Sequence, residues 1–250
     1  MEDFNVLMLA AGKSTRIRTI SQGKAKLLLP IAGRSIIKRN LDWLKDNAIA
    51  EVYINLHFQA EEIKKELSDY LGITQHLIEE KTLLGTAGAL INVCQQQRNT
   101  KPWLVIYGDN LFKMNLQTFF SHIQNTSADI VLTLFDTTKN KYTGIVGGRV
   151  RCDSEKNIIE FKEGDESYIS NYANAGVCWL NDKAIKKLIS QNFFDLSKDF
   201  FPYVISQSEL KIKAYLLPAN EFCLGLDTPE SYKEGVAILQ EQGVLQHDCH

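Results

Sequence analysis

The sequence lacks paired cysteines, domain linkers and long apolar runs. Its five cysteines are scattered and form no C-x-x-C pair, which argues against a disulfide framework and the common zinc and redox motifs. No stretch approaches a membrane span, and the acidic N-terminus does not resemble a signal peptide. We therefore expect a reduced, cytoplasmic protein with no membrane partner.

The sequence also lacks a strong charge of either sign. Its formal net charge is −2, with 44% hydrophobic and 23% charged residues, the composition of an ordinary soluble domain. Such a chain has no bulk attraction for nucleic acid, so we expect no nucleic-acid partner. Neither repeats nor a Ser/Pro-rich linker divide it, which predicts a single domain over residues 1–250. Nothing in the sequence indicates an oligomeric state.

Short apolar runs alternate with helical periodicity through the first half of the chain. The strand-like runs lie at 6–9, 52–57, 76–78, 103–107 and 130–134, and the helical patterns at 37–44, 63–71, from Thr86 onward, and at 116–123. Buried runs of this kind predict a mostly parallel sheet covered by helices on both faces.

The alternation of predicted strands and helices ends after about Asp136. "TGIVGGRV", "NIIEF" and "NAGVCWL" are typical of strands with few helices between them, and helical patterns return at 182–189, 198–205 and 229–239. We interpret residues 1–135 as an α/β part, 136–228 as an inserted β-rich part, and 229–250 as a C-terminal helix and tail.

A basic tract without acids follows the first predicted strand. It contains five cations, Lys13, Arg16, Arg18, Lys24 and Lys26, before an apolar run at 27–29 that reads as a strand. Ligands of α/β sheets bind beyond the carboxyl ends of the strands. Gly12 permits close backbone approach, and successive amides there can form an anion-binding nest. With the hydroxyls of Ser14 and Thr15, the tract suits a polyphosphate, although neither a Walker loop nor a G-x-G-x-x-G turn is present.

These residues resemble the sugar-phosphate nucleotidyltransferase family. "LAAGKSTR" and "KLLLPIAG" are similar to its signature L-A-A-G-x-x-T-R followed by P-K-x-L-L-P-x-x-G. Four further segments follow in the family's order: Glu79-Glu80 with Leu84-Gly85-Thr86-Ala87, Gly108-Asp109, Asn174-Ala175-Gly176, and Thr228-Pro229. Matches spread over nearly the whole chain are far more specific than one motif.

The resemblance implies a Rossmann-like fold with a mixed, mostly parallel sheet, and Mg²⁺-dependent transfer of a nucleotidyl group from a nucleoside triphosphate to a sugar 1-phosphate. Arg16 and Lys26 would be catalytic, and Asp109 and Asp227 would hold Mg²⁺. The nucleotide would lie in the 1–135 part, against Leu9, Ala10, Ala11, Gly12, Lys13, Ser14, Thr15, Glu80, Gly85, Thr86 and Ala87. The acceptor would lie in the 136–228 part, against Gly144, Lys162, Glu163 and Asn174.

Two departures from the family pattern bear on the site. Gly164 stands where a Lys is common, and Lys162, which could replace it, would point to the opposite face of a continuing strand. Gly225 stands where a second metal-binding Asp is common, and we assign that role to Asp227 two places later. Two carboxylates without an ion would repel each other, so we expect metal to stabilise the fold.

Several readings stay open from sequence alone. Asp109 could be only a turn residue and Thr86 only a helix cap. The short form most resembles enzymes that activate mannose, manno-heptose or N-acetylmuramate 1-phosphates, and we expect no appended β-helix. The base is undetermined, and Asp227-Thr228-Pro229 favours a cytidylyl alternative. A regulatory module that binds nucleotide sugars without turnover is the remaining alternative, favoured by Gly164 and Gly225.

Overall fold

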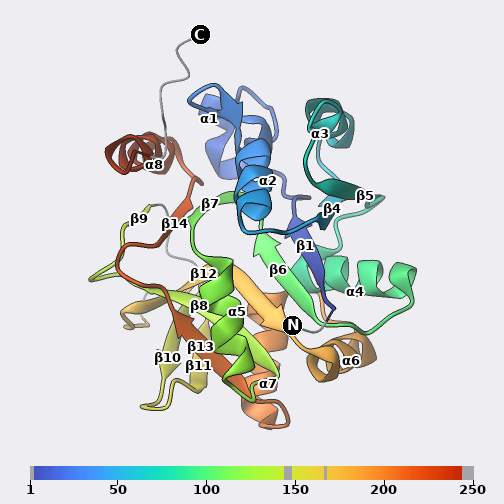
Figure 1. The fold of residues 1–250 in the computed structure, drawn as a ribbon, viewed down its shortest axis with the longest axis vertical. Coiled ribbons are helices and arrows are strands. Elements are labelled where there is room, and N and C mark those ends of the chain that lie inside the picture. The colour runs from blue at the N-terminus through green and yellow to red at the C-terminus, as the bar shows by residue number, and fades with distance from the viewer. Residues whose placement is uncertain (1–2, 144–147, 166–167, 244–250) are drawn as a thin grey trace.

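The computed structural model describes residues 3–143, 148–165 and 168–243. Its centre is a parallel sheet, whose strands are β6 (Trp103–Tyr107), β1 (Asn5–Leu9), β4 (Glu51–Leu56) and β5 (Thr74–Glu79), in that spatial order (Figure 1). All four coincide with predicted strands. Their carboxyl ends meet at one edge of the sheet, where the loop after β1 carries the basic tract.

The sheet continues beyond β6 with reversed strands. β12 (Tyr172–Leu180) is antiparallel to both β6 and β8 (Ile130–Asp136), and β13 (Ile212–Leu216) pairs parallel with β8. β10 (Arg149–Cys152) and β11 (Ile158–Lys162) complete the nine strands that this sheet has within the described residues. The predicted mixed α/β sheet is therefore confirmed.

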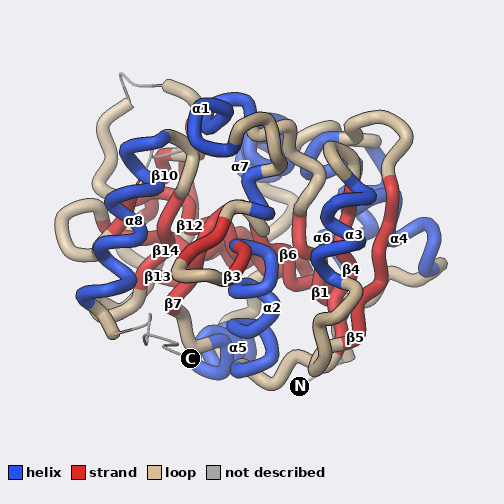
Figure 2. The backbone as a smooth tube through the Cα atoms, turned by 90° about the horizontal axis from the view of Figure 1, so that it is seen from above, coloured by secondary structure: helices blue, strands red, loops and turns tan. Residues whose placement is uncertain are grey.

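Helices cover both faces of the sheet (Figures 1 and 2). The side chains of β1 alternate between two cores, with Val6 and Met8 in one and Leu7 in the other, as the two-residue repeat of a strand requires. The first core also holds α2 (Ile36–Asp46), α3 (Ala60–Leu67) and α5 (Leu116–Gln124); the second holds α4 (Gly85–Gln97), α6 (Asp182–Gln191) and α7 (Phe201–Gln207). The short α1 (Arg18–Ser21) and the C-terminal α8 (Pro229–Glu241) complete the helices of the described residues.

The apolar run at 27–29 was wrongly predicted to be a strand. Residues Lys26–Leu28 form a 3₁₀ turn, because the amides of Leu28 and Leu29 donate to carbonyls three residues earlier. A hairpin of β2 (Pro30–Ile31) and β3 (Arg34–Ser35) follows this turn. Three consecutive apolar residues carry no periodicity that separates a buried turn from a buried strand.

Two predicted helices have different bounds. The helix predicted for 63–71 ends at Leu67, and Leu71 is exposed. The helix predicted for 198–205 begins instead with a π turn at Leu196–Phe200, because the Asp195 carboxylate accepts hydrogen bonds from the amides of Ser197 and Lys198.

Sequence patterns did not predict β13 or a small second sheet of β7 (Asn110–Lys113), β14 (Phe222–Gly225) and β9 (Tyr142–Thr143). These strands are short, and their partners are distant in sequence. The predicted "TGIVGGRV" strand is described only at both ends, because residues 144–147, which include the predicted acceptor residue Gly144, lie outside the described residues.

No helix in the described ranges is long and apolar enough to cross a membrane. The four cysteines at described positions, Cys94, Cys152, Cys178 and Cys223, are free thiols.

Asn40 ties α2 to the turn that follows β6. Its fully buried side-chain amide donates to the carbonyls of Gly108 at 2.7 Å and Asn110 at 2.9 Å. It thus fixes the backbone on both sides of Asp109, which places a predicted metal ligand at a defined position against the core.

We expect Asn40→Ala to lower the free energy of unfolding by about 1–3 kcal/mol, because two buried carbonyls lose their donor. Denaturant unfolding monitored by circular dichroism would measure the change. Asn220→Ala, at an exposed loop position, is the matched control and should unfold as wild type does. Equal stabilities of the two variants would contradict this role of Asn40.

Candidate active site

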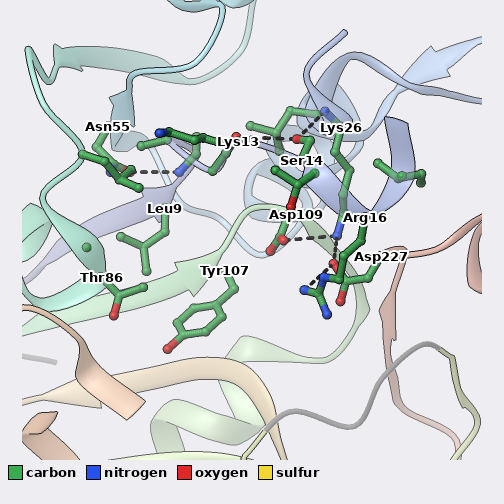
Figure 3. A pocket seen from close by; sticks show the side chains of 18 of the residues that line it. Leu9, Lys13, Ser14, Arg16, Lys26, Asn55, Thr86, Tyr107, Asp109 and Asp227 are labelled. Atoms are coloured by element: carbon green, nitrogen blue, oxygen red, sulfur yellow. Dashed lines mark hydrogen bonds and ion pairs between the residues drawn. The ribbon is translucent and has the colours of Figure 1, made fainter. Parts of the chain in front are cut away.

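A cavity of about 400 Å³ opens at the carboxyl ends of β1 and β6 (Figure 3). Most of the predicted nucleotide-binding residues line it. From the loop after β1 these are Leu9, Ala10, Ala11, Gly12, Lys13, Ser14 and Thr15, and from the start of α4 they are Gly85 and Thr86. The predicted catalytic residues Arg16 and Lys26 and the predicted metal ligands Asp109 and Asp227 line the cavity as well. Two cations of the tract, Arg18 and Lys24, line neither this cavity nor its neighbour.

A buried hydrogen-bond chain holds the loop after β1. The Ala10 amide donates to Asn55 Oδ1 at 2.8 Å, and Asn55 Nδ2 donates to Glu80 Oε1 at 2.8 Å. The other Glu80 oxygen accepts from the Leu84 amide at 3.1 Å. Glu80, predicted to contact nucleotide, is thus buried beneath the cavity rather than lining it, because both of its oxygens face protein donors.

Ser14 and Gln59 fix the backbone that carries Lys26. Ser14 adopts a left-handed conformation, with φ of 53°, and its Oγ accepts from the Lys26 amide at 2.8 Å. The Gln59 side-chain oxygen accepts from the Ala25 amide. The Ser14 hydroxyl, predicted to face a phosphate, therefore also positions the neighbouring lysine.

Lys26 lies between the two predicted metal ligands. Its Nζ is 2.7 Å from Asp227 Oδ1 and 3.1 Å from Asp109 Oδ2, and its side chain is only 3% exposed, against 17% for Asp227 and 47% for Asp109. Arg16 Nη2 lies 3.3 Å from the same Asp227 oxygen, and Figure 3 shows the four side chains together. Burial lowers the pKa of Lys26, but the two carboxylates outweigh it and hold that pKa above its ordinary value.

Strand pairing brings Asp227 to Asp109. β14 runs antiparallel to β7 with Gly225 opposite Asn110, so the chain after Gly225 passes back along the turn that carries Asp109. The next residues begin α8, where the Thr228 side chain and the Ser231 side chain cap each other's backbone amides. An Asp two places after the family position is therefore aimed at the same site and anchored by a helix cap.

A second cavity of about 320 Å³ adjoins the first and shares Arg16, Tyr107, Asp109 and Asp227 with it. The predicted acceptor residues Glu163 and Asn174 line it, as do Gly164 and Gly225, where the chain departs from the family pattern. A Cβ on Gly164 would meet nothing within 4 Å, whereas one on Gly225 would lie 3.2 Å from the Thr143 carbonyl oxygen.

Lys162 does not reach the second cavity. It ends β11 with an exposed side chain, and its Nζ lies 3.8 Å from Glu160 Oε1. The strand alternation that placed this side chain on the opposite face explains the outcome.

An irregularity in β12 aims Asn174 at the cavity. The pairing of β12 with β8 shifts register between Asn174 and Cys178, and Gly176 within this segment has φ of +76°. The Gly176 amide donates to Asn174 Oδ1 at 3.1 Å. Bulges of this type re-aim side chains near active sites.

Sequence reasoning missed several residues that line the first cavity, among them Tyr107, Leu83 and Phe194. Tyr107 is shared with the second cavity, and its hydroxyl lies 3.1 Å from Ser197 Oγ; burial raises its pKa. Leu83 and Phe194 are exposed apolar side chains, the latter 58% exposed. Tyr107 directly precedes the predicted Gly108-Asp109 turn, the one available signal; Leu83 and Phe194 gave none.

Gly85 and Thr86 fix the α4 terminus against the segment of Phe194. Gly85 has φ of +74°, and a Cβ there would lie 2.2 Å from the Phe194 carbonyl oxygen, which accepts from the Ala87 amide. Thr86 Oγ1 accepts from the Leu196 amide at 2.7 Å. Ala87, predicted to contact nucleotide, is fully buried and lines neither cavity, because it packs into the core beneath the helix.

The Asp109–Asp227 pair suits Mg²⁺. Mg²⁺ keeps several of its waters and is usually bound by one or two carboxylates together with phosphate oxygens. These two carboxylates face a cavity that could hold phosphates. Both carboxylates already point at one cation, the Lys26 ammonium. Within the described part of the chain, no cluster of three or more His, Cys, Asp or Glu side chains could hold a metal by itself.

Comparison with known proteins shows the family of this chain. The model of the nucleotidyl transferase family matches residues 5–217. The chain belongs to the nucleotidyl transferase family. Similar sequences include a mannose-1-phosphate guanylyltransferase of Mycobacterium tuberculosis, 24% identical over 94% of this chain and 64% of that protein. Another is the catalytic subunit beta of a mannose-1-phosphate guanylyltransferase from Drosophila pseudoobscura pseudoobscura, 27% identical over 93% and 61%.

This member of the nucleotidyl transferase family spans less than two thirds of the length of those relatives. Among solved structures, HddC from Yersinia pseudotuberculosis is similar with a TM-score of 0.77 at 21% identity, over 95% of this chain and all of that one. The inositol-1-phosphate CTP transferase of T. maritima has a TM-score of 0.77 at 17% identity, over 95% of each chain. These two structural similarities show the fold of this chain.

Glu163 of this nucleotidyl transferase family member gives a pH-dependent test of the second cavity. Burial raises the pKa of its carboxyl, and the charge of Asp195 acts in the same direction, against Lys198 and Arg16. A folded pKa above the unfolded one means that ionised Glu163 destabilises the fold at neutral pH. The penalty disappears as pH falls below the unfolded pKa of about 4.3.

We therefore expect Glu163→Gln to raise the melting temperature at pH 7, with a gain that shrinks toward pH 4. Calorimetry across this range would measure it. Glu155→Gln, in an exposed turn, is the control and should follow wild type at every pH. A Glu163→Gln protein no more stable than wild type at pH 7 would contradict the conclusion that ionised Glu163 destabilises the fold.

Proposed function

We propose that this protein transfers a nucleotidyl group from a nucleoside triphosphate to a sugar 1-phosphate, with Mg²⁺, and releases pyrophosphate. The observation that carries the proposal is the contact of Lys26, in the first cavity, with Asp109 and Asp227, the two carboxylates that line both cavities. Transfer between two bound substrates needs such a junction, because the attacking and leaving oxygens lie on opposite sides of one phosphorus.

The first cavity is suited to the triphosphate. Lys13, Arg16 and Lys26 supply positive charge, and the loop after β1 supplies backbone amides. A volume of about 400 Å³ lies within the range of small-ligand pockets. The apolar side chains of Leu83 and Phe194 offer surfaces for a base.

The second cavity is suited to the acceptor. Glu163 and Asn174 line it and can hydrogen-bond sugar hydroxyls. Arg16, which lines both cavities, and Lys26, which contacts the shared carboxylates, would offset the charge that develops during transfer. Asp109 and Asp227 would hold Mg²⁺, which supplies further neutralisation of phosphate charge when bound.

The relatives guide the choice of substrates. Those reported above are named mannose-1-phosphate guanylyltransferases, and HddC has also been crystallised with GMP-PN. GTP with mannose 1-phosphate, or with a heptose 1-phosphate, is therefore the first pair that we propose.

Cytidylyl transfer is the second candidate. Asp227 stands directly before Thr228-Pro229, the arrangement that favoured this reading in the sequence. In the structure this Asp227 contacts Lys26. Under this alternative the same two cavities would hold CTP and another phosphorylated acceptor.

The test is pyrophosphate release by the full chain with GTP, UTP or CTP, Mg²⁺ and a panel of sugar 1-phosphates. We expect turnover with GTP and mannose or heptose 1-phosphate. Lys26→Ala should lower kcat at least about 100-fold, because it removes charge that stabilises the transition state. Lys24→Ala, an exposed lysine of the same tract, should keep wild-type kcat.

Turnover with CTP alone would favour the second candidate. Nucleotide-sugar binding without any pyrophosphate release would favour the non-catalytic module. A folded Lys26→Ala variant with unchanged kcat would remove Lys26 from the catalytic machinery.

A further inference from the structure

The space between Asp109 and Asp227 holds a positive charge of the chain's own. Lys26 Nζ hydrogen-bonds one oxygen of each carboxylate, at 3.1 Å and 2.7 Å. Arg16 adds a second positive charge at 3.3 Å from Asp227. Two cations thus balance two carboxylates, and the repulsion expected between unpaired carboxylates does not arise.

A divalent ion held by both carboxylates would lie close to the ammonium that they already share. Mg²⁺ binds carboxylate oxygen at about 2.0–2.1 Å, and the ammonium already approaches both groups within hydrogen-bond distance. A dication and an ammonium repel each other at such separations, most strongly where water is excluded. Since Lys26 is 3% exposed, its charge is poorly screened. The free protein therefore offers a dication no net attraction at this pair of carboxylates.

A polyanion in the first cavity can draw Lys26 away. The backbone of Lys26 is held by Ser14 Oγ and that of Ala25 by Gln59, so the anchor stays while the four-carbon side chain can swing. Lys26 and Arg16 both line the cavity where a triphosphate would lie. A triphosphate gives the ammonium new anionic partners and frees the carboxylates in the same event.

We infer that Lys26 is an internal counter-cation that keeps divalent metal off Asp109 and Asp227 until a nucleoside triphosphate attracts its ammonium. The inference rests on the proposed function for the identity of that polyanion. It replaces the sequence-based expectation that metal alone stabilises the fold: in the free protein, metal does so only when Lys26 is removed.

Mn²⁺ binding to the full chain without nucleotide or sugar phosphate tests this directly, with free Mn²⁺ measured by electron paramagnetic resonance. We expect Lys26→Met to bind Mn²⁺ at least about tenfold more tightly than wild type, since about 1.4 kcal/mol corresponds to a factor of ten. Lys24→Met, the matched control, should bind as weakly as wild type. The double variant Lys26→Met/Asp227→Asn should lose the gain, which locates the ion at the carboxylate pair.

Thermal unfolding gives a second readout. Added Mg²⁺ should raise the melting temperature of Lys26→Met but not of wild type. Lys26→Gln, which retains a polar side chain, repeats both measurements if Lys26→Met does not fold.

Wild-type protein that binds Mn²⁺ as tightly as the Lys26 variants would overturn the inference. Folded Lys26 variants without Mn²⁺ affinity would overturn it equally. These experiments contain no nucleotide, so their failure is separate from a failure to release pyrophosphate.

Discussion

The contact of one buried lysine with two carboxylates is the constraint on which the rest of the site depends. Lys26 joins the loop after β1 to the turn after β6 and to the segment before α8. Transferring a charge from water into the protein interior is costly, so a buried ammonium requires its partners to be placed accurately. The surrounding hydrogen bonds of Ser14 and Asn40 supply that placement from two sides.

The same contact lies where two cavities meet, which links stability to chemistry. Under the proposed function, a pair that stabilises the free protein would have to be broken, at least in part, for Lys26 to face phosphate and for the carboxylates to face metal. The fold provides for this change because the backbone of Lys26 is fixed while its side chain is long. Under the proposed function, the metal would offset part of the negative charge that the polyanion brings into the site.

Local sequence patterns predicted the parallel strands and the residues that meet at the site. Buried runs such as Val6–Leu9 carry a clear signal, and the motifs named Arg16, Lys26, Asp109 and Asp227 in advance. The features that the sequence did not predict depend on contacts between segments that are distant in sequence. β14 is a strand because Leu224 pairs with Leu111, far away in sequence. Glu80 belongs to a predicted motif but faces inward, and Phe194 reaches the cavity only because the segment after α6 packs on the start of α4.

A double-mutant cycle on unfolding measures the central interaction most directly. Lys26→Met and Asp227→Asn, singly and together, would be compared with wild type by denaturant unfolding in metal-free buffer. The account predicts that Lys26→Met alone costs roughly 1.5–3 kcal/mol, because the two carboxylates lose their shared hydrogen-bonding cation. The double variant should cost less than the sum of the two single variants by at least about 1 kcal/mol. Strictly additive costs would contradict the claim that Lys26 and Asp227 hold each other in place.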